Sequence, residues 1–137
     1  MENVIRILSK SVGRTLYVCL RRNELMLRHI ESGHELAAKS DVEFSNSRLL
    51  VANTTLVTSM IKRSMRTILA RFGIAPTIVM HPLEMVEGGL SEVEEKTLTE
   101  IGYAVGAVRV VVVTGPALSD SDVMATVANR SVGRKSA

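Results

Sequence analysis

The sequence predicts an α/β domain with a mixed sheet, and three observations favour this fold class. Residues 15–39 show the alternation and turn signals that are typical of antiparallel strands. Over residues 54–128, segments with helical periodicity separate short apolar stretches, as in crossover connections between parallel strands. Apolar residues make up 46% of the 137 residues, which suits a chain with one core and one domain.

The amino-terminal part of this domain is expected to form three antiparallel strands. Residues 15–30 predict a β-hairpin, because the apolar positions alternate and Arg22-Asn23 provide a tight connection. After a turn at Gly33, the stretch "ELAAK", residues 35–39, predicts a third and weaker strand. Residues 40–47 are expected to form a loop.

A helix is predicted over residues 54–72, where one apolar face recurs at helical spacing. Asn53 or Thr54 is expected to cap its start and Gly73 to end it. The stretch "PTIVM", residues 76–80, then predicts a strand.

Residues 91–106 predict a second helix, which begins with a capping box formed by Ser91 and Glu94. Gly88 and Gly89 are interpreted as residues that let the chain turn into this helix. Its inner face is expected to consist of Leu90, Val93, Leu98, Ile101 and Val105.

The stretch "VRVVVV", residues 108–113, has no polar alternation, which predicts a central strand covered on both faces. A last short helix is expected from Ser119–Asp122 to about Val127, followed by a flexible basic tail over 129–137. The resulting order, β-β-β-α-β-α-β-α, is that of the ribonuclease H-like fold, which actin-like ATPases also use. Two right-handed crossovers in one direction would place both long helices on one face of the sheet.

The domain is predicted to span residues 15–128, and an amphipathic segment, residues 1–14, precedes it. Its apolar positions recur at helical spacing: Val4, Ile5, Leu8 and Val12. A helix docked on the domain is one interpretation, and weak membrane association through the flanking Arg6, Lys10 and Arg14 is the alternative. No apolar run is long enough to span a bilayer. With Cys19 as the single cysteine, a reducing, cytoplasmic location is expected.

The sequence predicts no catalytic residue, no cofactor and no metal site. Gly88-Gly89 has neither the lysine of a phosphate-binding loop nor the glycine spacing of a dinucleotide fold. A ribonuclease H-type nuclease needs carboxylates for two metal ions, but the first strand, "TLYVCLRR", has none. The histidines are not at ligand spacing.

Two candidate sites remain. His81 lies at the carboxyl end of a predicted parallel strand, where open α/β sheets bind ligands, so His81, Glu84 and Thr114 form a possible ligand groove. The possible interaction surface is the cationic side of the first long helix: Lys62, Arg63, Arg66 and Arg71. The acidic second helix is expected to balance much of that charge. Arg21 and Arg22 are interpreted as solvated strand-end residues.

Four stretches closely resemble the YjaA family of small enterobacterial proteins: "LRRNEL", "FSNSRLLVAN", "LEMVEGGLSEVEE" and "LSDSDVMA". They are distributed over about residues 16–128, nearly the whole domain. The resemblance implies a role in the stress response, but it implies no biochemical activity.

Three stretches also resemble the first large subdomain of MreB, the actin-like rod-shape protein: "RLLVANTTLVTSMIKRSM", "PTIVMHP" and "SEVEEKTLTEIGYAVGAVRVVVVTGP". The resemblance implies an actin-like half-domain. The turn "LRRNEL" lacks the glycine of the MreB phosphate-binding hairpin, and Thr114-Gly115 replace the acidic pair before Pro116. The resemblance therefore implies the fold without the machinery that holds a nucleotide.

The sequence thus favours a non-enzymatic, cytoplasmic bacterial protein that acts by contact with another protein or with itself. One alternative is a regulator that binds a small anionic ligand near His81 and Thr114. The other is weak nucleic-acid binding through Arg63, Arg66 and Arg71, although the chain is poor in the aromatic side chains that stack on bases.

Overall fold

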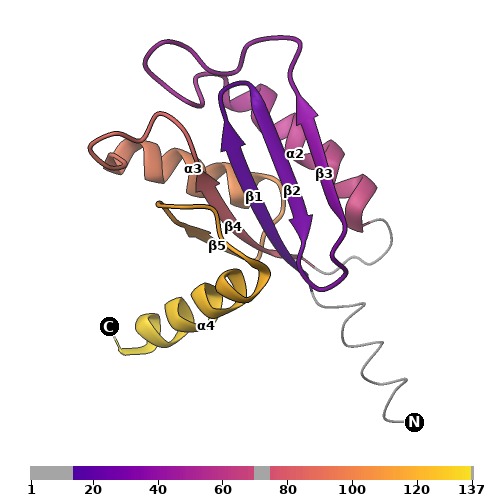
Figure 1. The fold of residues 1–137 in the computed structure, drawn as a ribbon, viewed down its shortest axis with the longest axis vertical. Coiled ribbons are helices and arrows are strands. Elements are labelled where there is room, and N and C mark those ends of the chain that lie inside the picture. The colour runs from indigo at the N-terminus through magenta and orange to yellow at the C-terminus, as the bar shows by residue number, and fades with distance from the viewer. Residues whose placement is uncertain (1–13, 70–74, 137) are drawn as a thin grey trace.

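The computed structural model describes residues 14–69 and 75–136 (Figure 1). Its elements are β1 (Thr15–Arg21), β2 (Glu24–His29), β3 (Glu35–Lys39), α2 (Thr54–Leu69), β4 (Thr77–Pro82), α3 (Glu92–Ala104), β5 (Arg109–Val112) and α4 (Asp120–Ser136). The α/β class and the predicted order of elements are confirmed. The expected amino-terminal amphipathic segment, apart from Arg14, lies outside the described residues, as do Arg71 and Gly73.

The five strands form one mixed sheet in the order β3-β2-β1-β4-β5. Strand β2 pairs antiparallel with both β1 and β3, whereas β4 pairs parallel with both β1 and β5. The register places Thr15 beside Thr77 and Leu20 beside Pro82, so β1 and β4 end at the same edge of the sheet. Strand β1 is the central strand.

Helices α2 and α3 cover one face of the sheet and α4 covers the other (Figure 1). Val57 and Ile61 of α2 share an apolar cluster with Leu98 of α3. Val123 of α4 belongs to a separate cluster that contains Tyr17. The prediction that the two crossover helices lie on the same face is therefore confirmed.

The predicted position of the valine-rich strand is wrong, because β5 lies at the edge of the sheet and not at its centre. The side chains are covered on both faces, since Val110 packs in the α3 cluster and Val111 in the α4 cluster. Val108, just before the strand, is 67% exposed. Cover on both faces explains the continuous apolar run, but it does not require a strand on both sides.

The last helix is longer than the sequence predicted. Helix α4 continues to Ser136, so the segment 129–137 is helical over most of its length, whereas a flexible tail was expected. No proline interrupts residues 117–136. The start of α4 is as predicted, because the Ser119 hydroxyl accepts a hydrogen bond from the Asp122 backbone N–H at 3.2 Å.

Within residues 14–69 and 75–136, no helix is both long and apolar enough to cross a membrane. The expectation of weak membrane association concerns residues outside these ranges.

Candidate functional site

An apolar groove opens at the carboxyl end of β4, on the face covered by α2 and α3, with a volume of about 80 Å³. Open α/β sheets bind ligands at this end of their parallel strands. The lining comes from the loop before α2, the end of β4, the following loop and the start of α3: Leu49, Leu50, Val51, Pro82, Met85, Val86, Leu90, Val93, Glu94, Thr97 and Leu98.

The first wall of the groove is a loop held in place by Asn23, in the turn between β1 and β2. Asn23 adopts a positive φ of 57°, a conformation that asparagine tolerates better than most residues. Its side-chain oxygen accepts hydrogen bonds from the backbone N–H groups of Phe44 at 2.8 Å and Ser45 at 2.9 Å. These bonds fix the loop that brings Leu49 and Leu50 to the groove.

Phe44 anchors the same loop to the core and to α2. Its side chain is fully buried, and its carbonyl accepts the N–H groups of Ala52 at 2.7 Å and Asn53 at 2.9 Å. Asn53 then caps α2 by accepting the Leu56 N–H at 3.0 Å, as predicted. The wall therefore joins the rigid start of a helix, which limits its freedom to move.

The second wall is the start of α3, where the predicted capping box is confirmed. The Ser91 hydroxyl accepts the Glu94 N–H at 3.1 Å, and the Glu94 carboxylate accepts the Ser91 N–H at 3.2 Å. Gly88 and Gly89 have φ values of 79° and 94°, so they make the turn that precedes the helix, as predicted. Val93 was expected on the inner face of α3, but its side chain is 75% exposed.

The chain between β4 and α3 carries a strained residue at the groove. Met85 has a φ of 60°, although it is not glycine. This conformation costs roughly 1–2 kcal/mol for a residue with a Cβ atom. The Met85 side chain packs against the core and lines the groove. Local strain of this kind concentrates at functional sites, so it supports the choice of this region as the candidate site.

The segment that forms one side of the groove is rich in carboxylates. Residues 83–95 contain no lysine or arginine, and their five acidic residues are Glu84, Glu87, Glu92, Glu94 and Glu95. The Glu84 carboxylate accepts the backbone N–H of Arg22 at 2.6 Å. The other glutamates give this side of the groove a negative charge, which opposes a small anion and favours a cationic partner.

The three residues predicted for a ligand groove do not form one. His81 is fully buried within the sheet, where its ring contacts Tyr17 and the carbonyl of Gly115. Glu84 is exposed and bonded to Arg22. Thr114 lines a different surface hollow, with Val113, Leu118, Thr126 and Asn129. The groove at the strand ends exists, but other side chains line it.

Hydrogen bonds define the protonation state of His81. The Tyr17 oxygen accepts the Leu118 N–H at 2.9 Å and lies 2.6 Å from His81 Nδ1, to which the hydroxyl donates when the imidazole is neutral. The Gly115 carbonyl can only accept, so His81 Nε2 carries the proton across 2.8 Å. Burial lowers the pKa of His81 and raises the pKa of Tyr17 to about 12. This neutral, saturated pair positions the loop after β5 and is not available as a base.

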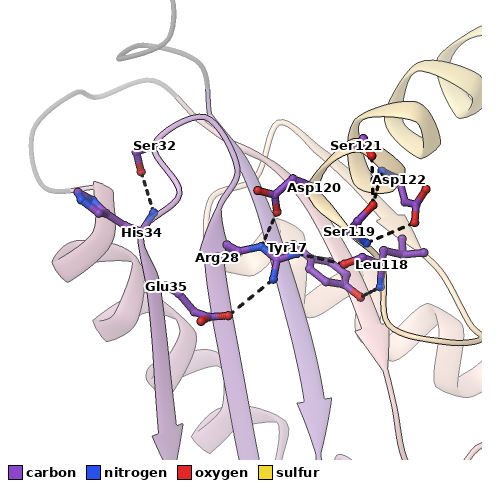
Figure 2. Close-up of polar contacts among 10 residues, drawn as sticks. All are labelled: Tyr17, Arg28, Ser32, His34, Glu35, Leu118, Ser119, Asp120, Ser121 and Asp122. Atoms are coloured by element: carbon purple, nitrogen blue, oxygen red, sulfur yellow. Dashed lines mark hydrogen bonds and ion pairs between the residues drawn. The ribbon is translucent and has the colours of Figure 1, made fainter.

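Arg28 extends this network to the start of α4 (Figure 2). It is paired across the strands with Tyr17, and its guanidinium carbon lies 5.2 Å from the centroid of the Tyr17 ring. Its Nε contacts the Asp120 carboxylate at 2.6 Å, and its Nη2 donates to the Leu118 carbonyl at 3.1 Å. Sequence reasoning missed Arg28, although a cation beside a core tyrosine in a predicted hairpin was a usable signal.

The cations of α2 form a separate surface. Lys62, Arg63 and Arg66 are exposed, and Arg71 lies outside the described residues. No ion pair in the described part of the chain joins α2 to the acidic residues of α3. The expected internal balance of charge is therefore not achieved by direct contacts, although the two helices lie side by side. Within residues 14–69 and 75–136, no group of three or more His, Cys, Asp or Glu side chains could hold a metal ion.

No family model matches the chain, and no solved structure matches it either. These comparisons give no support to the resemblance to MreB. A curated relative is the "Uncharacterized protein YjaA" of Escherichia coli (strain K12), which is 38% identical over 93 residues. The similarity covers 63% of this chain and 72% of the relative. With nearly three quarters of that protein matched, this chain belongs to the YjaA family.

Proposed function

We propose that the protein has no enzymatic activity and acts by binding a protein partner, either a different protein or a second copy, at the groove. The observation that carries this proposal is an apolar, partly exposed surface at the ligand-binding end of the sheet. Val93 is 75% exposed and Leu49 is 42% exposed, and both line the groove. Apolar side chains that gather around an open groove typically mark an interaction site.

The size of the groove favours a protein partner over a small ligand. Pockets for small molecules typically enclose about 300–1,000 Å³. The groove encloses about 80 Å³ between Leu49 and Val93, which is room for an inserted aliphatic side chain. Insertion of a few anchoring side chains is how protein interfaces gain most of their affinity.

The charges around the groove argue against the two alternative functions. Five glutamates in residues 83–95 would repel a small anionic ligand or a nucleic-acid phosphate. The exposed cations of α2 could meet phosphates, but Tyr17 and Phe44 are buried and cannot stack on bases. Of the aromatic side chains in the described residues, Tyr103 on α3 is the exposed one.

The absence of enzymatic activity is part of the proposal. Its support is the state of the polar groups nearest the strand ends, because Tyr17 and His81 are neutral and bonded to each other. We expect the purified protein to show no magnesium-dependent ATP turnover. Turnover above that of a buffer blank would contradict this part.

We further propose that the domain is a degenerate actin-like half-domain with the ribonuclease H-like fold. The order of its elements and its mixed sheet support this assignment. In the turn between β1 and β2, the Arg22 N–H is bonded to Glu84 and the Asn23 N–H to the Ser45 hydroxyl. Backbone donors that a phosphate-binding hairpin would offer are thus occupied. A cytoplasmic location and a link to stress belong to the same proposal and rest on the sequence.

A site-specific cross-linking experiment tests the proposed interaction. A photoreactive amino acid replaces Val93 in one version of the full chain and Val108, which is 67% exposed, in the control. Val108 precedes β5, so it lies at the opposite end of the parallel strands from the groove. We expect a discrete adduct from position 93 and none from position 108, with the adduct re-formed by the purified components. No adduct at 93, or equal adducts at both positions, would contradict the proposal.

A further inference from the structure

We propose that the groove binds residues 1–13 of a second copy of the chain, so that the protein assembles through its own amino-terminal segment. This inference rests on the proposed function and names the partner. It is drawn from three observations: the apolar side chains of the segment, the opposite charges of segment and groove, and the distance between them.

The amino-terminal segment carries apolar side chains at a spacing that an apolar groove can accept. Val4, Ile5 and Leu8 fall on one side of a helical repeat, and all three are aliphatic. The groove between Leu49 and Val93 has room for an aliphatic side chain of this size. Docking an amphipathic segment into an apolar groove is a common mode of peptide recognition.

The segment and the groove have opposite charges. Residues 1–13 contain Arg6 and Lys10 against a single acidic residue, Glu2. Residues 83–95 contain five glutamates and no cation. Attraction between them would orient the segment before its apolar side chains are buried.

Distance favours a second copy over the same chain. Arg14 is held at the amino end of β4, where its carbonyl accepts the Thr77 N–H at 2.9 Å. The groove lies beyond Pro82, at the other end of that strand, roughly 17 Å away along the sheet. Helices α2 and α3 cover the face between these points, so the chain would also have to pass around a helix about 10 Å wide. The six steps from Leu8 to Arg14 span at most about 20 Å when fully extended.

Each copy offers one segment and one groove, so two copies can exchange segments reciprocally. Such an exchange forms a closed, twofold symmetric dimer. Both contacts would then contribute to one assembly, which raises its stability above that of a single inserted segment.

Two complementary variants of the full chain test the inference by sedimentation velocity over a range of concentrations. Leu8→Glu places a charge in the segment, and Val93→Lys places one at the groove. Val93 is 75% exposed, so the second change leaves the fold intact, which far-ultraviolet circular dichroism verifies. Val108→Lys is the matched control, since Val108 is 67% exposed. We expect each of the two test variants to weaken self-association by about tenfold or more, and the control to leave it unchanged.

Mixing the two variants gives the decisive result. Leu8→Glu retains an intact groove and Val93→Lys retains an intact segment, so the mixture should contain a 1:1 heterodimer that neither variant forms alone. Docking within one chain cannot produce this complementation. Absence of complementation, or a wild-type protein that stays at the 14.9 kDa of one chain at all concentrations, would overturn the inference.

The photoreactive amino acid at position 93 separates failure of this inference from failure of the proposed function. With a mixture of isotopically heavy and light chains, we expect cross-linked peptides that join position 93 of one chain to residues 1–13 of the other. An adduct with a different protein would overturn this inference and support the proposed function. Cross-links within one chain would overturn the inference as well, and no adduct would overturn both.

Discussion

The two faces of the sheet are stabilised in different ways. Among the residues whose side chains the structure describes, sixteen buried apolar residues form one cluster on the α2–α3 face, and six form the α4 cluster. The α4 face adds a polar network in which the Arg28 guanidinium lies beside the Tyr17 ring (Figure 2) and the Tyr17 hydroxyl is hydrogen-bonded to His81. The larger cluster stabilises mainly by burial, and the α4 face relies more on directional bonds.

This difference explains where the groove lies. Burial of apolar surface has no preferred direction, so the α2–α3 cluster can extend to the surface and leave an apolar opening at its rim. Leu50 and Leu98 belong to the cluster and also line the groove. On the α4 face, Tyr17 and His81 already bond to each other and His81 also bonds to the Gly115 carbonyl, which leaves these two side chains little capacity for a ligand.

The largest expected effect comes from one substitution made on both faces. Val57 in α2 and Val123 in α4 are both fully buried, so Val57→Ala and Val123→Ala remove the same atoms. We expect about 2–3 kcal/mol of destabilisation at Val57, where the large cluster cannot collapse around the cavity. We expect about 1 kcal/mol at Val123, because α4 packs on a smaller cluster and can shift inward.

Urea unfolding at constant pH measures both variants, with the exposed substitution Val42→Ala as the control for loss of an unburied valine. Equal losses of unfolding free energy at Val57 and Val123 would contradict the proposed difference between the faces, because they would show that the smaller cluster is packed as rigidly as the larger one.

The next effect tests how closely α3 approaches the sheet. A Cβ atom at Gly102 would lie 2.5 Å from Val110 Cγ2 and 2.9 Å from Val110 Cγ1. Gly102→Ala should therefore destabilise the protein by about 2 kcal/mol, because α3 or β5 must move apart to remove the overlap. Thermal unfolding measures the loss, with Ala104→Gly in the same helix as a reference for helix propensity. Stabilisation by Gly102→Ala would show that the α3–β5 contact is loose.

The polar network on the α4 face is tested by removing one oxygen atom. Tyr17→Phe deletes the hydroxyl that accepts from Leu118 N–H and donates to His81 Nδ1. Two buried groups then lose their partner, and we expect about 1–2 kcal/mol of destabilisation, with little change in packing volume. Urea unfolding checks the value. A neutral result would indicate that water or another group replaces the hydroxyl, and the network would not hold this face together.

Local signals in the sequence predicted most elements of the fold. The capping box at Ser91, the cap at Asn53 and the glycine turn at Gly88 were confirmed because each depends on neighbours within a few residues. The position of β5 was not predictable in this way. The valines of β5 indicate that α3 and α4 cover both of its faces. They do not indicate whether a further strand pairs with the edge of β5 that faces away from β4.

The candidate site was harder to predict, because it depends on small shifts in element ends. The predicted strand ended at Met80, which placed His81 in a loop, but β4 continues to Pro82 and carries His81 into the interior. At the start of α3, the helical pattern assigned Val93 to the inner face, yet the neighbouring loop leaves it exposed. The wall formed by Leu49 depends on bonds from Asn23, which is distant in the sequence and gives no local signal.

The smallest expected effect is a dependence of stability on pH that originates at His81 on the α4 face. Burial lowers the pKa of His81 in the folded protein, so between that value and about 6.5 the unfolded chain binds the extra proton. Stability should be complete above about pH 6.5, fall as the pH drops below it, and stop falling below the folded pKa. Protonated His81 would have to donate from Nδ1 to a Tyr17 oxygen that already accepts the Leu118 N–H, which leaves the hydroxyl proton without its partner.

The measurement that isolates this effect compares wild-type protein with His81→Gln, whose amide can replace both hydrogen bonds without titrating. Other ionisable groups, such as the His29–Glu31 pair, are present in both proteins, so the difference between them reports His81 alone. We expect the urea midpoint of the wild type to fall more than that of the variant between pH 7.5 and pH 5.5. If the urea midpoints of the two proteins fell equally with pH, the folded protein would accommodate a charged His81. The bonds of His81 to Tyr17 and Gly115 would then not exclude protonation.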